Sequence, residues 1–356
     1  KIQNSLTTKY YLCLMRLMLY LLSIIYGVCI TLRNALFDYD VLKSKEHKVP
    51  VICIGNLSIG GSGKTPLTNY IAKILSQEHK IAILSRGYGR KSSKFKYVEL
   101  NSAVSAVGDE PLQLKINNPN CIVAVNNNRN YGVEKILFDH PETNAILLDD
   151  GFQHRRIKAG LNIIVTPFYK SFIKDNLLPL GTLREPANEA TRADIILISK
   201  TPENATPMEK KELIKTLNLK AHQKGYFSSI IYHKYKSLKN NTTLKYARDY
   251  SITLVSGIVE PNPLVEHLEK EGKKVTLIKF PDHHNYTAKD IKNILSIHKK
   301  DKSVKKLILT TEKDATKLKQ FSTHFNRENV YYISIDIELN DREIFEKQLL
   351  DYVTKN

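Results

Sequence analysis

The sequence predicts an α/β protein with a doubly wound, mainly parallel sheet, an apolar N-terminal helix and a second, smaller α/β domain. Two observations predict this fold class. Short apolar runs alternate with segments of helical periodicity along most of the 356 residues, which is the pattern of parallel strands joined by crossover helices. The first of these runs is followed directly by a glycine-rich loop and an amphipathic helical segment.

The expected strands are apolar runs bounded by glycine, proline or polar residues. In chain order they cover 49–54, 80–85, 121–125, 145–150, 161–165, 194–198, 227–232, 250–255, 275–280, 307–310 and 330–337. The composition changes near Pro202, and a lysine-rich helix is expected over Met208–Lys224. We therefore place a domain boundary near residue 220 and expect three parts, 1–36, 37–220 and 221–356, of which the last contributes to the cleft of the second.

The glycine-rich loop lies between the strand at 49–54 and the helical pattern of Pro66–Ser76. Its glycines let backbone amides converge on an anion, and the following helix adds the positive end of its dipole. Lys64 would reach the outer phosphates of a nucleotide, and Thr65 would offer its hydroxyl to Mg²⁺. Ser58 replaces the usual first glycine, so a turn without a ligand remains the alternative. The order of strand, loop and helix favours a sheet of the P-loop NTPase type. The residues expected to bind ATP are Ser58, Ile59, Gly60, Gly61, Ser62, Gly63, Lys64 and Thr65.

The formal net charge of +18 favours an anionic partner, which could be nucleic acid, a nucleotide, a phosphorylated substrate or an acidic membrane. The alternative is a lysine-rich surface without a specific partner, because the lysines are spread along the chain. The four cysteines show no metal-ligand spacing, which is typical of buried thiols in a reducing, cytoplasmic compartment.

An apolar stretch lies at Tyr10–Ile30, and its uninterrupted part is Leu17–Ile30. Fourteen residues are too few to span a bilayer comfortably, and no small-residue cleavage site of a signal peptide follows. Arg16 and Arg33 stand within and after the stretch. We expect a helix that lies in or dips into the cytoplasmic leaflet. The alternative is a core helix packed against the sheet.

Polar residues follow several of the expected strands. Asp149 and Asp150 end one of them, where a nucleotide site needs carboxylates for Mg²⁺. Gly151–Arg156 then adds a histidine and two arginines, a set that packing explains poorly. Arg86–Lys91 follows another strand, and Gly108–Pro111 opens a helix with two acidic residues. Taken singly, these last two are explained more simply as a solvated turn and a helix start.

The second domain carries two polar clusters, Pro281–Tyr286 and Thr311–Asp314, each directly after a strand. Strand ends of parallel sheets open onto clefts. The paired histidines could equally belong to a surface loop. A zinc site is not expected, because no cysteine or third histidine lies at ligand spacing.

Together these motifs resemble the tetraacyldisaccharide 4′-kinase family, the lipid A 4′-kinases of Gram-negative bacteria. The likeness extends from the N-terminal helix to Glu312–Asp314 and so covers most of the chain. It is carried by Gly55–Leu57 with Gly60–Pro66, Ser85–Gly89, Gly108–Pro111, Asp149–His154, Leu183–Glu185 and Asp282–His283, in the order typical of the family.

The resemblance implies an enzyme on the cytoplasmic face of the bacterial inner membrane, peripheral or monotopic. It would transfer the γ-phosphoryl group of ATP to the 4′-hydroxyl of an acylated glucosamine disaccharide 1-phosphate, using ATP and Mg²⁺. Its expected partners are this lipid A precursor and inner-membrane lipids, with no nucleic acid and no obligate protein partner.

The resemblance also implies roles for individual residues. Asp109 would take the proton from the sugar hydroxyl and His283 would pair with it, although the neighbouring His284 leaves the choice of histidine open. Lys64 would hold the outer phosphates. The Mg²⁺ ligands would be Thr65, Asp149 and Asp150, with Gln153 and Glu185. Substrate or phosphate contacts would come from Arg86, Tyr88, His154 and Arg184.

Three other functions compete with this interpretation. A nucleotide-gated membrane switch that uses GTP should carry an [NT]KxD element, but Ser199–Pro202 lacks the aspartate and Thr311–Asp314 has another order. A nucleic-acid binder should show a basic stripe with aromatic residues or a helix-turn-helix, and neither is evident. A P-loop ligase acting on a small soluble acid is the third alternative.

Overall fold

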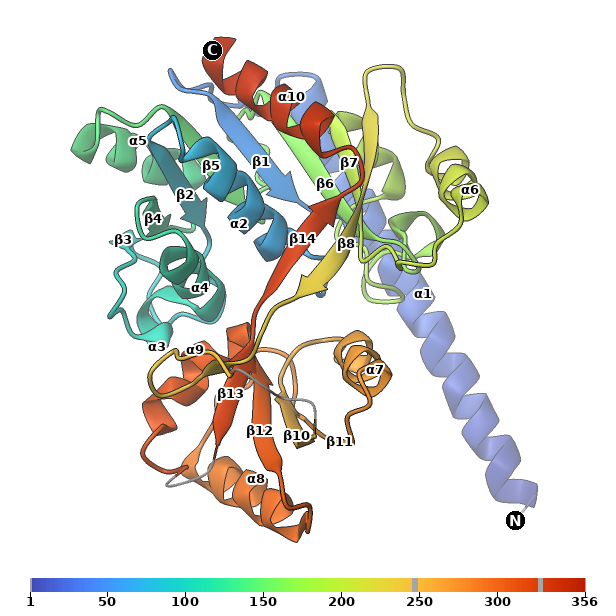
Figure 1. Ribbon diagram of the computed structural model, residues 1–356. Helices are drawn as coiled ribbons and strands as arrows, with labels where there is room; N and C mark the ends of the chain where they lie inside the picture. Colours follow the sequence, from blue (N-terminus) through green and yellow to red (C-terminus); the bar gives the residue numbers. More distant parts are fainter. Residues whose placement is uncertain (1, 245–248, 326–328, 356) are drawn as a thin grey trace. The chain divides into compact units, whose positions relative to one another are not determined.

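The computed structural model describes residues 2–244, 249–325 and 329–355, with side chains from residue 13 onward. The chain forms two compact units, each assembled from separate segments (Figure 1). The first unit comprises Lys1–Leu84, Asn128–Ser229 and Glu338–Asn356, and the second comprises Ser85–Asn127 and Ile230–Ile337. This grouping is more interleaved than a single boundary near residue 220. The predicted domains 1–36, 37–220 and 221–356 stay a prediction.

The first unit is built on a parallel sheet in the order β8–β7–β6–β1–β5–β2. Every residue of β1, β2, β5 and β7 is buried, as expected for parallel strands covered on both faces. Its strands are β1 (Val51–Gly55), β2 (Ile81–Ser85), β5 (Ala145–Asp149), β6 (Leu161–Pro167), β7 (Ile195–Ser199) and β8 (Lys224–Tyr232). Its helices are α1 (Ile2–Asp38), α2 (Lys64–Leu75), α5 (Arg129–Asp139), α6 (Pro207–Leu217) and α10 (Arg342–Lys355).

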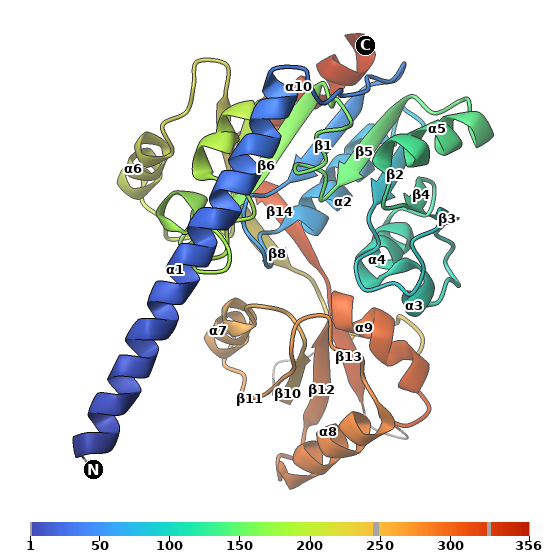
Figure 2. The same ribbon diagram turned by 180° about the vertical axis from the view of Figure 1, so that it is seen from behind.

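Helices cover both faces of this sheet. In Figure 1, α2 and α10 lie in front of it and α1 passes behind; Figure 2, seen from the opposite side, shows α1 in front. The predicted doubly wound α/β fold is therefore confirmed for this unit. The pairing of β1 with β5 sets Ile54 beside Asp149, so the loop after β1 and the residues after β5 leave the sheet at the same edge.

The second unit contains a five-stranded sheet in the order β11–β10–β12–β13–β9. Alternate residues of β12 face opposite sides: Ile308 packs with α8 and α9, whereas Leu307 and Leu309 pack with α7. The sheet strands are β9 (Lys236–Ser237), β10 (Ser251–Ser256), β11 (Val275–Lys279), β12 (Lys306–Thr311) and β13 (Val330–Ile333). The helices are α3 (Val104–Val107), α4 (Asp109–Asn117), α7 (Asn262–Lys270), α8 (Ala288–Lys300) and α9 (Glu312–Leu318), and a short antiparallel pair is formed by β3 (Lys96–Tyr97) and β4 (Ile122–Val125).

Most predicted strands agree with the structure to within three residues at each end, but two predicted elements after α1 differ by more than this. The helix expected over Met208–Lys224 ends at Leu217, because Asn218 adopts a left-handed conformation with φ 48° and the chain then enters β8. The single strand expected at 330–337 is two strands, β13 and β14 (Ile335–Leu339). Apolar residues recur at alternate positions from Ile333 to Leu339, so periodicity alone does not reveal the change of partner.

The N-terminal apolar stretch forms one continuous helix, α1, of 37 residues. Within the described part of the chain, Cys13–Asp38 is long and apolar enough to cross a membrane by length and composition, and 11% of its most apolar window is buried. This corrects two expectations. The apolar segment is longer than the fourteen residues considered, and α1 is not a core helix. Large exposed apolar side chains on it include Leu14, Leu17, Leu21, Ile25, Val28 and Leu32.

The last helix, α10, belongs to the first unit through an aromatic contact. The ring of Phe345 is fully buried, with its centroid 5.1 Å from that of Tyr226 and 6.4 Å from that of Tyr70.

We expect Phe345→Ala to lower the free energy of unfolding of this unit by about 3–5 kcal/mol, because it leaves a large cavity. The neighbouring Ile344→Ala is the matched control, since that side chain is 58% exposed, and its effect should stay within about 0.5 kcal/mol. Urea unfolding of both variants measures the difference; equal losses would contradict the packing described.

Candidate active site

The glycine-rich loop keeps its shape through bonds within the first unit. Gly60 and Gly63 have φ values of 107° and 96°, which side chains other than glycine rarely adopt. The side-chain amide of Asn56 donates to the Ser58 carbonyl at 2.5 Å and to Ser62 Oγ at 3.1 Å. The hydroxyl of Ser199, at the end of β7, donates to the Ser62 carbonyl at 2.6 Å. Residues at the ends of β1 and β7 thus fix the shape of the loop before α2.

Asp149 and Asp150 extend from β5 beside this loop. Asp149 is buried and accepts a hydrogen bond from Thr68 of α2 at 3.1 Å. Asp150 has a φ of 51° and lies 3.6 Å from Lys64 Nζ, and Arg184 donates to both of its carboxylate oxygens at 2.9 and 3.0 Å. Burial opposes ionisation of Asp150, but Lys64 and Arg184 outweigh it and hold the pKa of Asp150 below its ordinary value.

Gln153 and Glu185 connect the same region to α1. Gln153 donates to the Asn56 carbonyl at 2.8 Å and accepts from Arg184 at 3.4 Å, and its carbonyl accepts from Arg33 at 2.6 Å. Glu185 is fully buried, bonded to Arg192 at 2.5 Å and 3.6 Å from Arg33. Burial raises the pKa of Glu185 despite these cations. Its contacts hold two arginines in place, and its role as a Mg²⁺ ligand stays a prediction.

These residues fit ATP and Mg²⁺. The first amides of α2 have no carbonyl partner within the helix, and Lys64 is its first residue. Mg²⁺ binds proteins through one or two carboxylates, with phosphate oxygens and water completing its shell. Asp149, Asp150 and the hydroxyl of Thr65 supply oxygens of this kind. The described residues contain no cluster of three or more acidic, histidine or cysteine ligands, so such a site would depend on the nucleotide for part of its coordination.

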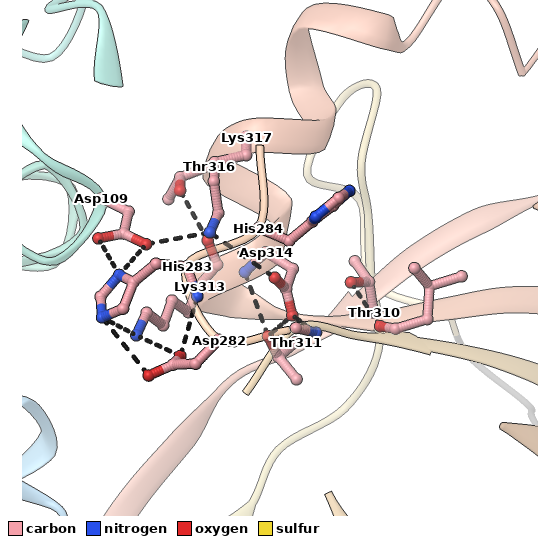
Figure 3. A network of polar contacts seen from close by, with 12 residues as sticks. Asp109, Asp282, His283, His284, Thr310, Thr311, Lys313, Asp314, Thr316 and Lys317 are labelled. Carbon is pink, nitrogen blue, oxygen red and sulfur yellow. Dashed lines mark hydrogen bonds and ion pairs between the residues drawn. The ribbon is translucent and has the colours of Figure 1, made fainter. Parts of the chain in front are cut away.

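The second unit contains a separate buried cluster around Asp109, the first residue of α4 (Figure 3). His283 Nδ1 lies 3.0 Å from Asp109 Oδ2 and 3.2 Å from Oδ1. Lys317 Nζ donates to Asp109 Oδ2 at 3.0 Å, and the backbone amide of Glu110 donates to Oδ1 at 3.0 Å. Two residues that the sequence predicted as partners, Asp109 and His283, are therefore in direct contact.

Lys313 contacts the other side of the histidine. Its ammonium lies 3.3 Å from His283 Nε2 and 3.3 Å and 3.2 Å from the carboxylates of Asp282 and Glu110. Burial opposes ionisation of Asp109, but the hydrogen bond from His283 and the charges of Lys313 and Lys317 hold its pKa below the ordinary value. Burial also opposes protonation of His283, yet Asp109 raises the pKa of the ring.

The neighbouring histidines have different partners. His284 lies 3.1 Å from Asp290 through its Nε2 and stacks on Phe280, with ring centroids 4.7 Å apart. His283 has a φ of 56°, a conformation that costs a non-glycine residue about 1 kcal/mol or more and persists only where the surrounding structure holds it. Of the two, it is His283 that contacts Asp109.

The four predicted substrate or phosphate residues divide between the units. Arg184 and His154 belong to the first unit, where the His154 amide donates to the Gly151 carbonyl at 2.9 Å. Arg86 and Tyr88 belong to the second unit; Arg86 is exposed, and the ring centroid of Tyr88 lies 4.9 Å from that of His283. Their contacts with a substrate stay predictions.

The family described as tetraacyldisaccharide-1-P 4′-kinase matches residues 15–354. This chain belongs to the tetraacyldisaccharide 4′-kinase family. Proteins named tetraacyldisaccharide 4′-kinase from Phocaeicola vulgatus and Bacteroides thetaiotaomicron are 37% and 39% identical to it, over 95% of this chain and 95% and 93% of theirs. LpxK from Aquifex aeolicus, crystallised in complex with ATP, matches with a TM-score of 0.74 and 29% identity over 95% of this chain and 99% of that one.

Membership of this kinase family confirms the predicted resemblance and the enzyme class, and an ATP-bound structural neighbour agrees with ATP as the nucleotide. Nothing in these comparisons supports the nucleotide-gated adaptor or the small-acid ligase.

Several residues of the site were not predicted from the sequence. Asn56 lies in a motif that carried the resemblance and Lys313 lies in the Thr311–Asp314 cluster, but neither had an assigned role. Arg33 is far from its partner Glu185 in the sequence, Arg192 follows Glu185 by seven residues, and neither arginine belongs to a motif. Lys317 follows Lys313 by one helical turn, and this i, i+4 spacing was the available signal that both ammonium groups face the same way.

The Asp109–His283 contact predicts a pH-dependent contribution to stability. The lowered pKa of Asp109 gives stability that is fully present above its unfolded value of about 3.9 and is lost as pH falls through the folded value. The raised pKa of His283 gives stability that is fully present below about 6.5 and is lost as pH rises through the folded value. We therefore expect His283→Ala to lower the melting temperature more at pH 5.5 than at pH 8.5. In an Asp109→Asn background this pH dependence should disappear; an equal loss at both pH values would contradict the ion pair.

Proposed function

We propose that this protein transfers the γ-phosphoryl group of ATP to the 4′-hydroxyl of a tetraacylated glucosamine disaccharide 1-phosphate, the step that forms lipid IVA in lipid A biosynthesis. The observation that carries this proposal is the Lys64–Asp150 pair at the common edge of β1 and β5. It brings together a phosphate-loop lysine, the type of residue that binds the outer phosphates, and a carboxylate after the adjacent strand, the type of residue that holds Mg²⁺ in phosphoryl transfer. The names of the relatives support the lipid acceptor.

The first unit holds the nucleotide in this proposal. The amides of Gly60–Thr65 and the ammonium of Lys64 bind the β- and γ-phosphates, with Ser58 and Ile59 opening the loop. Thr65, Asp149 and Asp150 hold Mg²⁺, assisted by Gln153 or Glu185. When bound, Mg²⁺ neutralises charge that develops on the phosphates. Arg184, which already binds Asp150 through both carboxylate oxygens, and His154 stabilise the transferred group.

The second unit supplies the proton acceptor. A bond forms between the 4′-oxygen and the γ-phosphorus, the bond from that phosphorus to the β–γ bridging oxygen breaks, and ADP leaves. The hydroxyl proton passes to the carboxylate of Asp109, which His283 orients, and Arg86 and Tyr88 bind the sugar phosphate or ring. A carboxylate with a lowered pKa is a weak base, but the loose transition state of phosphoryl transfer requires little proton removal early in the reaction.

The exposed apolar surface of α1 supports membrane contact in this proposal. Apolar side chains on several faces of the helix would bury themselves among acyl chains. The net charge of +18 suits an acidic leaflet and a phosphorylated lipid. We place the protein on the cytoplasmic face of the inner membrane, peripheral or monotopic.

The reaction is tested with purified protein, ATP, Mg²⁺ and the acylated disaccharide 1-phosphate in detergent, with mass spectrometry to detect a product heavier by one phosphate. We expect Lys64→Ala to abolish turnover and Asp109→Ala to lower kcat by roughly 10²–10⁴-fold, the contribution of a positioned general base. His283→Ala removes the ring that contacts Asp109, and His284→Ala is its matched control. The His284→Ala variant should retain activity, because His284 contacts Asp290 instead of Asp109. Full activity of Lys64→Ala would refute the assignment.

The membrane contact is tested separately by flotation with vesicles of phosphatidylethanolamine and phosphatidylglycerol. We expect the double variant Leu21→Asp and Ile25→Asp to lose most vesicle binding, because charges at the two exposed positions resist transfer into the bilayer. Tyr39→Asp, at an exposed residue just beyond α1, is the control and should still float. Undiminished binding by the double variant would contradict membrane contact through this face.

A further inference from the structure

Lys317 is a buried lysine that the proposed reaction does not use. Its side chain is 4% exposed, and lysine is rarely buried to this extent unless it is paired. Its ammonium donates to Asp109 Oδ2 at 3.0 Å and lies 4.0 Å from Asp314 Oδ1 (Figure 3). Removing a charge from water costs several kcal/mol, which only close partners repay. The position of this ammonium is therefore set mainly by the carboxylate of Asp109.

Three donors bind the carboxylate of Asp109 and occupy part of its hydrogen-bonding capacity. Each carboxylate oxygen has two lone pairs. Lys317 takes one on Oδ2 and the Glu110 amide takes one on Oδ1, while His283 Nδ1 lies within 3.2 Å of both oxygens. These three donors do not exhaust the four lone pairs, so an incoming hydroxyl can bind Asp109 while His283 stays paired with it. Lys317 and the amide each bind one oxygen, fix the plane of the carboxylate and leave the remaining lone pairs to the histidine and the hydroxyl.

The contact of Lys317 with Asp109 can be distinguished from a purely structural link between α4 and α9. The contact between α4 and α9 has other polar links, because Gln113 and Asn117 both donate to Glu312, at 2.7 and 3.1 Å. These links join the two helices without touching Asp109. Lys317 is the member of α9 that binds the carboxylate itself, whereas Lys313 contacts the histidine, Asp282 and Glu110.

We propose that Lys317 is a positioning residue for Asp109, whose ammonium holds the carboxylate in the orientation that accepts the proton of the sugar hydroxyl. This inference rests on the proposed function for its catalytic meaning, but the contact itself can be tested without turnover. Four charged or titratable groups face Asp109: His283 from the loop after β11, Lys313 and Lys317 from α9, and Glu110 from its own helix. Asp282 contacts Lys313, and Asp314 lies 4.0 Å from Lys317.

The kinetic test compares Lys317→Met, Lys317→Arg and the control Gln113→Ala across pH 5 to 9. We expect Lys317→Met to lower kcat roughly 10- to 100-fold, a part of what a positioned base contributes, with KM for ATP unchanged and the acidic limb of kcat moved to higher pH. Lys317→Arg should recover part of the loss, and Gln113→Ala should leave the pH profile in place. If Lys317→Met and Gln113→Ala share one profile, Lys317 is only structural and the proposal is wrong.

A double-mutant cycle tests whether Lys317 acts through Asp109. In an Asp109→Asn background, Lys317→Met should change kcat less than two-fold, because residues that act as a unit are not additive. A further ten-fold loss there would overturn the proposal.

Carbon-13 NMR titration of labelled aspartate, with the Asp109 signal assigned from Asp109→Asn, needs no acceptor. Asp109 should titrate at higher pH in Lys317→Met than in the unsubstituted protein. If the protein does not phosphorylate the disaccharide and this shift still appears, the proposed function fails and the positioning contact stands. An unshifted titration overturns the contact whatever the reaction. Should Lys317→Met not fold, Lys317→Gln serves for the same three measurements.

Discussion

The parallel pairing of β1 with β5 is the constraint on which the nucleotide site depends. Parallel strands expose their carboxyl ends at one edge, and the register that sets Ile54 beside Asp149 brings a loop and a carboxylate pair to that edge from positions almost a hundred residues apart. Ser199 reaches the same loop from the end of β7. A slip of one residue would turn these side chains to the other face, so the buried apolar residues that fix the register also fix the chemistry.

Both units place a carboxylate among cations, but they balance it differently. Asp150 is partly exposed and shared by Lys64 and Arg184, whose charges also suit phosphate. Asp109 is buried, and its cationic partners come from α9 and the loop after β11. When ATP and Mg²⁺ bind, Lys64 can pair with a phosphate in place of Asp150, and Asp150 can bind the metal in place of Lys64. Lys317 is buried, so it cannot pair with an incoming ligand in the same way, and its charge stays paired with Asp109.

Much of the fold follows from the sequence, because fully buried parallel strands require continuous apolar runs such as Ile81–Ser85. The loop and the Asp149–Asp150 pair were predictable for the same reason, since their places at strand ends are set locally. Partners from distant parts of the chain were not predictable. Glu185 contacts Arg33 of α1, and no spacing rule states which distant cation a buried acid will meet; its expected place at the metal stays a prediction. The end of α6 had a signal in the sequence, because asparagine readily adopts the left-handed conformation after a helix, but the polar, lysine-rich composition beyond it favoured a longer helix.

Helix α1 joins the membrane proposal to the chemistry. Its exposed side carries the large apolar residues, while its buried side bonds to backbone around the site: Tyr26 donates to the Arg184 carbonyl at 2.7 Å, and Arg33 donates to the Gln153 carbonyl at 2.6 Å. These two carbonyls belong to the residues that surround Asp150. A helix held only by apolar contacts could rotate or slide in a bilayer without effect on the sheet. Because α1 is hydrogen-bonded to these two positions, the lipid contact proposed for it would also fix the segments that carry Arg184 and Gln153.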